Sequence, residues 1–169
     1  GVTPELEKRI HKAMQDATVT GAKVVVCTCS TIGGVAETSG QQVNQMLLPK
    51  TNNEKPITFI SMRIDRAMAD EAVNTGKRIL LAAALESTLG STRAVIEDSA
   101  RKLAKTPEIQ ILHIKEAWKH FEAGDNTAYL QTIAQALLEH WKNYDVIVLA
   151  QASMAKTAEL CQEINIPIL

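Results

Sequence analysis

The 169-residue sequence contains few cysteines, few aromatic residues and no excess of charge of one sign. Three cysteines at irregular spacing argue against a disulfide framework and indicate a reducing compartment. Aromatic residues make up only 4% of the chain, so the stacking platforms that single-stranded nucleic acids need are missing. A formal net charge of −1 provides neither a basic surface for nucleic acid nor an acidic disordered tail.

Long apolar runs, targeting segments and the common nucleotide and metal motifs are also missing. The apolar run 79–85 is too short to cross a bilayer, and residues 1–9 lack the apolar segment of a signal peptide. The sequence has no Gly-x-Gly-x-x-Gly fingerprint, no Gly-Lys-Ser/Thr phosphate loop, no His-Glu-x-x-His motif and no cluster of its four histidines. We therefore predict a cytoplasmic protein that takes no cofactor and no metal and that binds neither nucleic acid nor membrane.

What is present is an alternation of helical and strand patterns along almost the whole chain. Apolar residues at helical spacing predict helices over 4–18, 34–45, 68–74, 88–103, 130–141 and 154–164. Short β-rich runs predict strands over 22–29, 57–62, 78–85, 109–114, 145–150 and 166–169, with a polar loop over 50–55. This order is typical of an α/β protein with parallel sheets.

The two halves of this pattern are similar, which predicts two pseudosymmetric lobes, each a parallel sheet with helices on both faces. We assign 1–62 to the first lobe, 63–76 to the connection and 77–169 to the second lobe. The last strand either stays in the second lobe or returns to the first. Because the chain begins on a helix and stops within a strand, we expect an N-terminal strand of the first lobe and a C-terminal segment to be missing from it.

Polar side chains and a cysteine follow four of the predicted strands, where ligands bind in open parallel sheets. The four segments are Cys27-Thr28-Cys29-Ser30-Thr31, Arg63-Ile64-Asp65-Arg66, Leu85-Glu86-Ser87-Thr88 and Gln151-Ala152-Ser153-Met154. Hydroxyls and free amides at helix N-termini suit the binding of a carboxylate or phosphate. The same hydroxyls also serve as ordinary N-caps, so one such segment is only weak evidence for a ligand-binding site. Three such segments in register are stronger evidence.

The cysteines allow two interpretations. Cys29 ends a strand and precedes a helix N-terminus, whose dipole stabilises a thiolate, the reactive form of the side chain. Alternatively, Cys27 and Cys29 are small buried hydrophobic residues. Their separation by one residue does not match the usual zinc spacing, and Cys161 on a later helix is expected to be structural.

Several segments resemble the aspartate/glutamate/hydantoin racemase-like superfamily. The run 24–31, Val-Val-Val-Cys-Thr-Cys-Ser-Thr, is similar to the first catalytic strand of that family, and Cys29-Ser30-Thr31 superimposes on its Cys-Asn-Thr triplet. The run 80–89 looks like the start of the second lobe, where Thr88 matches a family threonine and Leu85 departs from the pattern. The runs 63–73 and 145–154 resemble the connection between the lobes and the second catalytic strand.

The resemblance implies two α/β lobes with the active site in the cleft between them. It also implies proton transfer, without a cofactor, at the carbon next to a carboxylate, with one cysteine on each side of the substrate because inversion needs a base and an acid on opposite faces. Gln151 occupies the position of the second cysteine, and Ser153 the position at which glutamate racemases carry a histidine. A glutamine amide cannot act as a base near neutral pH.

These observations predict a racemase- or isomerase-like enzyme that acts on a small carboxylate or amino acid. Cys29 is the expected base or nucleophile, and the expected substrate-binding residues are Ser30, Thr31, Thr88, Gln151, Ser153 and, at the hinge, Asp65. Two alternatives stay open because of Gln151. One is a one-base decarboxylase or lyase, an activity that arylmalonate decarboxylases represent in this superfamily, and the other is a non-catalytic small-carboxylate-binding protein. A homo-oligomer also stays open.

Overall fold

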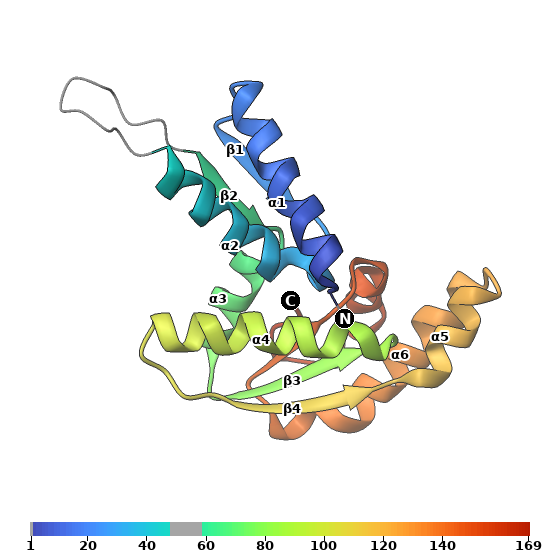
Figure 1. Cartoon of the computed structure of the whole chain (residues 1–169). Helices are drawn as coiled ribbons and strands as arrows, with labels where there is room; N and C mark the ends of the chain where they lie inside the picture. The colour runs from blue at the N-terminus through green and yellow to red at the C-terminus, as the bar shows by residue number, and fades with distance from the viewer. Residues whose placement is uncertain (1, 48–58) are drawn as a thin grey trace. The chain divides into compact units, whose positions relative to one another are not determined.

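The computed structural model describes residues 2–47 and 59–169, which form two compact units, Gly1–Arg66 and Ala67–Leu169. Both units combine parallel strands with packed helices, so the predicted α/β class is confirmed (Figure 1). The boundary between the units falls inside the segment 63–76 that the sequence marked as the connection. The loop predicted over 50–55 and the first residues of the strand predicted over 57–62 lie outside the described residues.

The described residues of the first unit form two helices and a two-stranded parallel sheet. Its elements are α1 (Pro4–Val19), β1 (Val24–Cys27), α2 (Ser30–Met46) and β2 (Ile60–Arg63). The register pairs Val24 with Ile60 and Cys27 with Arg63, so β1 and β2 end side by side. Cys29 and Arg63 are thereby brought to the same edge of the sheet.

The helices of the first unit pack on one face of its sheet. Ile10 and Met14 of α1 and Ala36 and Val43 of α2 form a buried cluster that contacts the inward side chain of Val25. A glycine allows the close approach of α2, since a Cβ at Gly40 would lie 2.1 Å from the Cβ of Ser61 in β2. The side chains of the opposite face are between 39% and 58% exposed, and they belong to Val24, Val26, Ile60 and Met62. Within the described residues of this unit, helices therefore cover one sheet face rather than the two that were expected.

The second unit contains a three-stranded parallel sheet in the order β4-β3-β5. Its strands are β3 (Arg78–Ala83), β4 (Glu108–His113) and β5 (Val146–Leu149). Its helices are α3 (Arg66–Thr75), α4 (Glu86–Lys102), α5 (Lys115–Glu122) and α6 (Asn126–His140), followed by the 3₁₀ segments η1 (Trp141–Asn143) and η2 (Ala152–Leu160).

The central strand β3 is buried on both faces, which explains its continuous apolar sequence. Ile79 and Leu81 point into a cluster with α3 and α4, whereas Leu80 and Ala82 point into a second cluster with α5, α6 and η2. The helices α4 and α6 accordingly lie on opposite faces of this sheet (Figure 1). Helices on both faces, as the sequence predicted, are present in this unit.

Two details of the second unit differ from the sequence-based prediction, and a third decides where the last strand lies. The helix α5 was not predicted, because it is short and buries only Ala117 fully. The helix predicted over 154–164 is instead the 3₁₀ segment η2, in which the buried residues Met154 and Thr157 are three positions apart, as three residues per turn require. The last strand stays in this unit, since Ile168 bridges Ile147 and the N–H of Leu149 donates to the Leu169 carbonyl at 2.8 Å. No helix among the described residues is long and apolar enough to cross a membrane.

Candidate functional site

Cys29 lies two residues beyond the carboxyl end of β1 and is the N-cap residue of α2. Its backbone is extended, with φ −105° and ψ 114°, and its exposed side chain makes no capping hydrogen bond. The first turn of α2 contains no acidic residue. The thiol is therefore placed at the positive end of a helix dipole, beside amides that α2 itself leaves unsatisfied.

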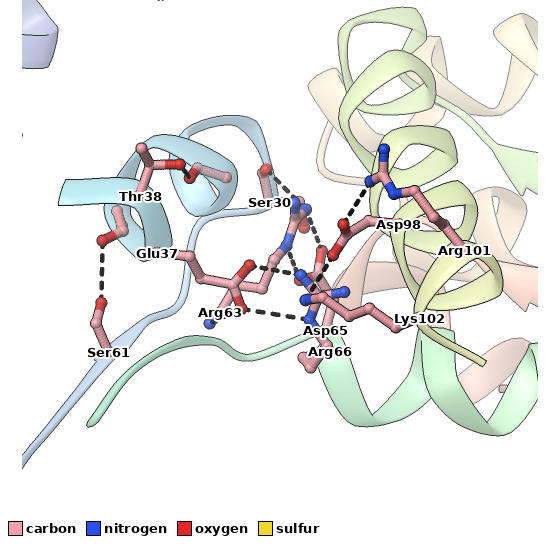
Figure 2. Close-up of polar contacts among 12 residues, drawn as sticks. Ser30, Glu37, Thr38, Ser61, Arg63, Asp65, Arg66, Asp98, Arg101 and Lys102 are labelled. Carbon is pink, nitrogen blue, oxygen red and sulfur yellow. Dashed lines mark hydrogen bonds and ion pairs between the residues drawn. The ribbon is translucent and has the colours of Figure 1, made fainter. Parts of the chain in front are cut away.

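A buried ion pair fixes the backbone next to Cys29 (Figure 2). Arg63, at the end of β2, is 4% exposed, and its Nη2 donates to the carbonyl oxygen of Ser30 at 3.1 Å. The same guanidinium donates to both carboxylate oxygens of Asp65, with Nη2 2.8 Å from Oδ2. The end of β2 thus holds the start of α2, and with it the position of Cys29.

Asp65 is ionised because of this pair. Burial acts to raise the pKa of the carboxyl, but the hydrogen bonds and the charge of Arg63, with a further hydrogen bond from Ser30, leave the pKa below its ordinary value. Both oxygens of Asp65 are engaged by Arg63. Asp65 thereby helps to position Ser30 through Arg63, and its role in binding substrate stays a prediction.

Two further residues complete the surroundings of Arg63. A Cβ on Gly33 would lie 2.9 Å from Arg63 Nε, so only glycine leaves room for the guanidinium beneath the first turn of α2. Glu37 accepts a hydrogen bond from the Arg63 backbone N–H at 3.4 Å and one from Arg66 Nε at 3.3 Å. Sequence reasoning assigned no role to Glu37, and the spacing along the chain contains no signal for a contact between residues 26 positions apart.

In the second unit, Gln151 links the ends of two strands. It follows β5, and its Oε1 accepts the backbone N–H groups of Ala84 and Leu85, each at 2.8 Å, just beyond β3. Thr88, in the first turn of α4, donates its hydroxyl to the Leu85 carbonyl at 2.8 Å. Gln151 therefore organises the segment between β3 and α4, with its amide oxygen bound to backbone.

Ser153 contacts an aromatic residue of the core. Its hydroxyl lies 2.8 Å from the hydroxyl of Tyr129, which is 1% exposed. Burial raises the pKa of Tyr129, and the hydrogen bond from Ser153 offsets part of that effect. Tyr129 is therefore a neutral phenol near neutral pH, and its contact with Ser153 is an uncharged hydrogen bond between two hydroxyls.

The predicted site residues thus fall into two sets, each at the carboxyl end of its own parallel sheet. Ser30 and Asp65 meet in the first unit, where Cys29 and the exposed Thr31 flank Ser30 along the chain. Thr88, Gln151 and Ser153 lie beyond β3 and β5 in the second unit. That both sets face one cleft stays a prediction.

Two other features bear on what the first unit can bind. A groove of about 530 Å³ runs between α1 and α2, and its lining includes His11, Lys12, Gln15 and Gln42 but none of the predicted site residues. Across residues 2–47 and 59–169, no group of three or more His, Cys, Asp or Glu side chains could hold a metal ion.

Comparison with known proteins identifies the fold. No protein-family model and no curated protein sequence matches the chain. Among solved structures, the glutamate racemase isoform RacE1 from Bacillus anthracis matches with a TM-score of 0.56 and 15% sequence identity, over 98% of this chain and 61% of that one. The chain has an aspartate/glutamate racemase-like fold. It therefore spans about three-fifths of the length of that racemase.

The racemase-like fold confirms the resemblance read from the strand ends at the level of architecture. At 15% sequence identity, the similarity supports a common fold but not a common activity. The activity has to be inferred from the residues of this chain.

Proposed function

We propose that the protein is a cofactor-independent, racemase- or isomerase-like enzyme that transfers a proton at the carbon next to the carboxylate of a small acid or amino acid. The observation that carries the proposal is the exposed thiol of Cys29 at the N-terminus of α2, in a chain with a racemase-like fold. A thiolate in this position is an effective base or nucleophile.

In this proposal the surroundings of Cys29 bind the carboxylate. The backbone amides at the start of α2 and the hydroxyl of Thr31 offer donors to an anion, and Ser30, whose hydroxyl donates to Asp65, stays a predicted substrate-binding residue. In the second unit, Thr88 and Gln151 stay predicted substrate-binding residues: the Thr88 hydroxyl donates to the Leu85 carbonyl, and the Gln151 amide nitrogen keeps N–H donors that suit developing negative charge. Cys29 then removes or delivers the α-proton, and the buried Arg63–Asp65 pair keeps its backbone in place.

The test is proton exchange at the α-carbon. The purified protein is incubated in D₂O with each enantiomer of aspartate, glutamate and other small amino acids, and the α-proton signal is followed by NMR. We expect loss of that signal for at least one substrate, and no loss with Cys29→Ser. The matched control is Cys161→Ser, which removes a buried thiol of the second unit and should leave exchange unchanged. Exchange that survives Cys29→Ser contradicts the proposal.

Gln151 favours a second candidate function, a one-base decarboxylase or lyase or a non-catalytic binding protein. Its amide oxygen is committed to the N–H groups of Ala84 and Leu85, and an amide supplies no second base. A one-base enzyme should label one enantiomer in D₂O and leave its mirror image untouched. Equal labelling of both enantiomers contradicts the one-base mechanism and requires a second base elsewhere.

Alkylation separates an enzyme from a binding protein. Fast reaction of Cys29 with iodoacetamide, slowed by a small carboxylate, supports a catalytic thiol that faces the substrate. A slow reaction, unchanged by carboxylates, supports the binding protein.

A further inference from the structure

We propose that the groove between α1 and α2 is a binding site for a small organic anion, a compact molecule that carries a carboxylate or a phosphate group. The groove lies within the first unit, and its described lining contains neither Cys29 nor the neighbouring Ser30 and Thr31. The inference is therefore independent of the proposed proton transfer.

Two packed helices form the groove. The helices α1 and α2 lie side by side (Figure 1). In each helix the lining residues recur every four positions and so come from one face, as at Glu7, His11 and Gln15 in α1 and at Gly34, Thr38 and Gln42 in α2. The volume of about 530 Å³ falls within the range of about 300–1,000 Å³ that small-molecule sites occupy. A compact organic molecule, larger than a single ion, therefore fits between the helices.

The side chain of Ser39 points to a ligand in this groove. Ser39 lines the groove and is only 5% exposed. Over residues 2–47 and 59–169, its hydroxyl makes no hydrogen bond. The neighbouring Thr38, in contrast, donates its hydroxyl to the Gly34 carbonyl oxygen at 3.1 Å, as hydroxyls in helices commonly do. Because buried polar groups are nearly always hydrogen-bonded, a bound molecule with an acceptor atom would supply the partner that Ser39 lacks.

The charges of the groove favour an anion. The helix α1 contributes two lysines and a histidine against one acidic residue, Glu7, whereas the described lining residues of α2 are all uncharged. Lys12 also pairs with Asp16 at 3.0 Å, but the two side chains are 74% and 62% exposed, and such pairs are weak. Lys8 makes no ion pair in the described part of the chain, so its ammonium group is available to a carboxylate or a phosphate.

The remaining lining residues suit the uncharged part of such a ligand. The half-buried Val35 presents apolar surface from α2. The side-chain amides of Gln15 and Gln42, one from each helix, can donate or accept hydrogen bonds. Apolar surface with a few polar groups is typical of small-molecule sites. In this proposal Ser39 donates to the anionic group, and Lys8 offsets its charge.

A titration of the full chain with matched probes tests the proposal. The ¹⁵N-labelled protein is titrated with phenyl phosphate, benzoate and benzyl alcohol, which share a phenyl ring and differ in charge. We expect saturable shifts of the backbone amide signals of Val35 and Ser39 with at least one of the two anions, and a several-fold weaker response to benzyl alcohol. The anion that binds more tightly distinguishes a phosphate site from a carboxylate site.

Variants separate a ligand contact from a structural role. Ser39→Ala removes an unpartnered hydroxyl, so it should weaken anion binding several-fold while the melting temperature of the unliganded protein stays the same or rises. Lys8→Ala should weaken anion binding several-fold and leave the response to benzyl alcohol unchanged. The matched control is Lys142→Ala, which removes an exposed lysine of the second unit and should leave anion binding unchanged. Cys29→Ser should also leave binding in the groove unchanged, so this proposal and the proposed proton transfer can fail separately.

Several results would overturn the proposal. They are the lack of a saturable shift at Val35 and Ser39 with either anion, equal affinity for benzyl alcohol, and unchanged anion binding in Lys8→Ala or in folded Ser39→Ala. A dimer whose dissociation on dilution shifts the same signals would also overturn it, because a second copy of the chain would then occupy the groove. Lys8 is exposed, so Lys8→Ala decides the question even if Ser39→Ala fails to fold.

Discussion

The guanidinium of Arg63 is buried against the carboxylate of Asp65, with Nη2 2.8 Å from Oδ2, and the same Nη2 donates to the carbonyl of Ser30. Two charges that leave water together are stable only when their hydrogen bonds are made, and here they are directed at the residue that follows Cys29. The pair therefore connects the stability of the first unit with the position of its exposed thiol.

Replacement Asp65→Asn should destabilise the first unit. It leaves the Arg63 charge buried without its counter-ion, and breaking a buried pair in this way costs about 3–5 kcal/mol. The free energy of unfolding in urea measures the effect. The matched control is Asp16→Asn, which breaks the exposed pair with Lys12 and should change the free energy of unfolding by less than about 1 kcal/mol. Equal effects of the two replacements would show that the Arg63–Asp65 pair is not buried in solution.

The second unit should lose stability in acid through Asp145. Its hydrogen bond from Arg78, with further bonds from the backbone N–H groups of Arg78 and Lys77, lowers the pKa of Asp145 to about 2. Because the folded pKa lies below the unfolded value of 3.8, the unfolded state binds the proton first as the pH falls. This contribution is complete above pH 3.8 and is lost between that value and about 2.

The measurement is the free energy of unfolding as a function of pH for the unmodified protein and for Asp145→Asn. The difference between the two should shrink as the pH falls through that window. A difference that stays constant with pH would mean that the carboxylate of Asp145 has the same proton affinity in the folded and unfolded states.

Replacing a helical glycine by alanine should have opposite effects on the stability of the protein in α2 and in α4. Gly40→Ala introduces a Cβ 2.1 Å from that of Ser61, and such overpacking costs about 1–3 kcal/mol. Gly90→Ala, in α4, meets nothing within 4 Å and should instead stabilise its helix by up to about 1 kcal/mol. Thermal or urea unfolding of both variants is the check. Stabilisation by Gly40→Ala would contradict the close packing of α2 on β2.

The three cysteines should react with iodoacetamide in the order Cys29, Cys27, Cys161. Cys29 is exposed and Cys27 half-buried, whereas Cys161 is 2% exposed and burial raises the pKa of its thiol. Brief alkylation followed by peptide mass spectrometry gives the order. Preferential labelling of Cys27 would mean that Cys27, and not Cys29, is the reactive thiol.

Much of the fold follows from local sequence. The uninterrupted apolar run at 79–83 predicts a strand with both faces covered, and β3 has that environment. Helical spacing places α1 within one residue of its observed ends, because Pro4 and the apolar stripe mark them. Short elements were less predictable: α5 buries too little surface to leave a periodic pattern, and η2 repeats every three residues rather than every 3.6.

The sequence by itself determined that Cys29, Asp65 and Gln151 follow strands, because the local residue pattern predicts where each strand ends. Only the tertiary structure decided what these side chains do. Gln151 accepts from Ala84 and Leu85, more than sixty positions away, and Arg63 reaches Ser30 from the neighbouring strand. The register of the parallel sheets sets such partners, and register results from the packing of whole elements rather than from the residues beside each polar group.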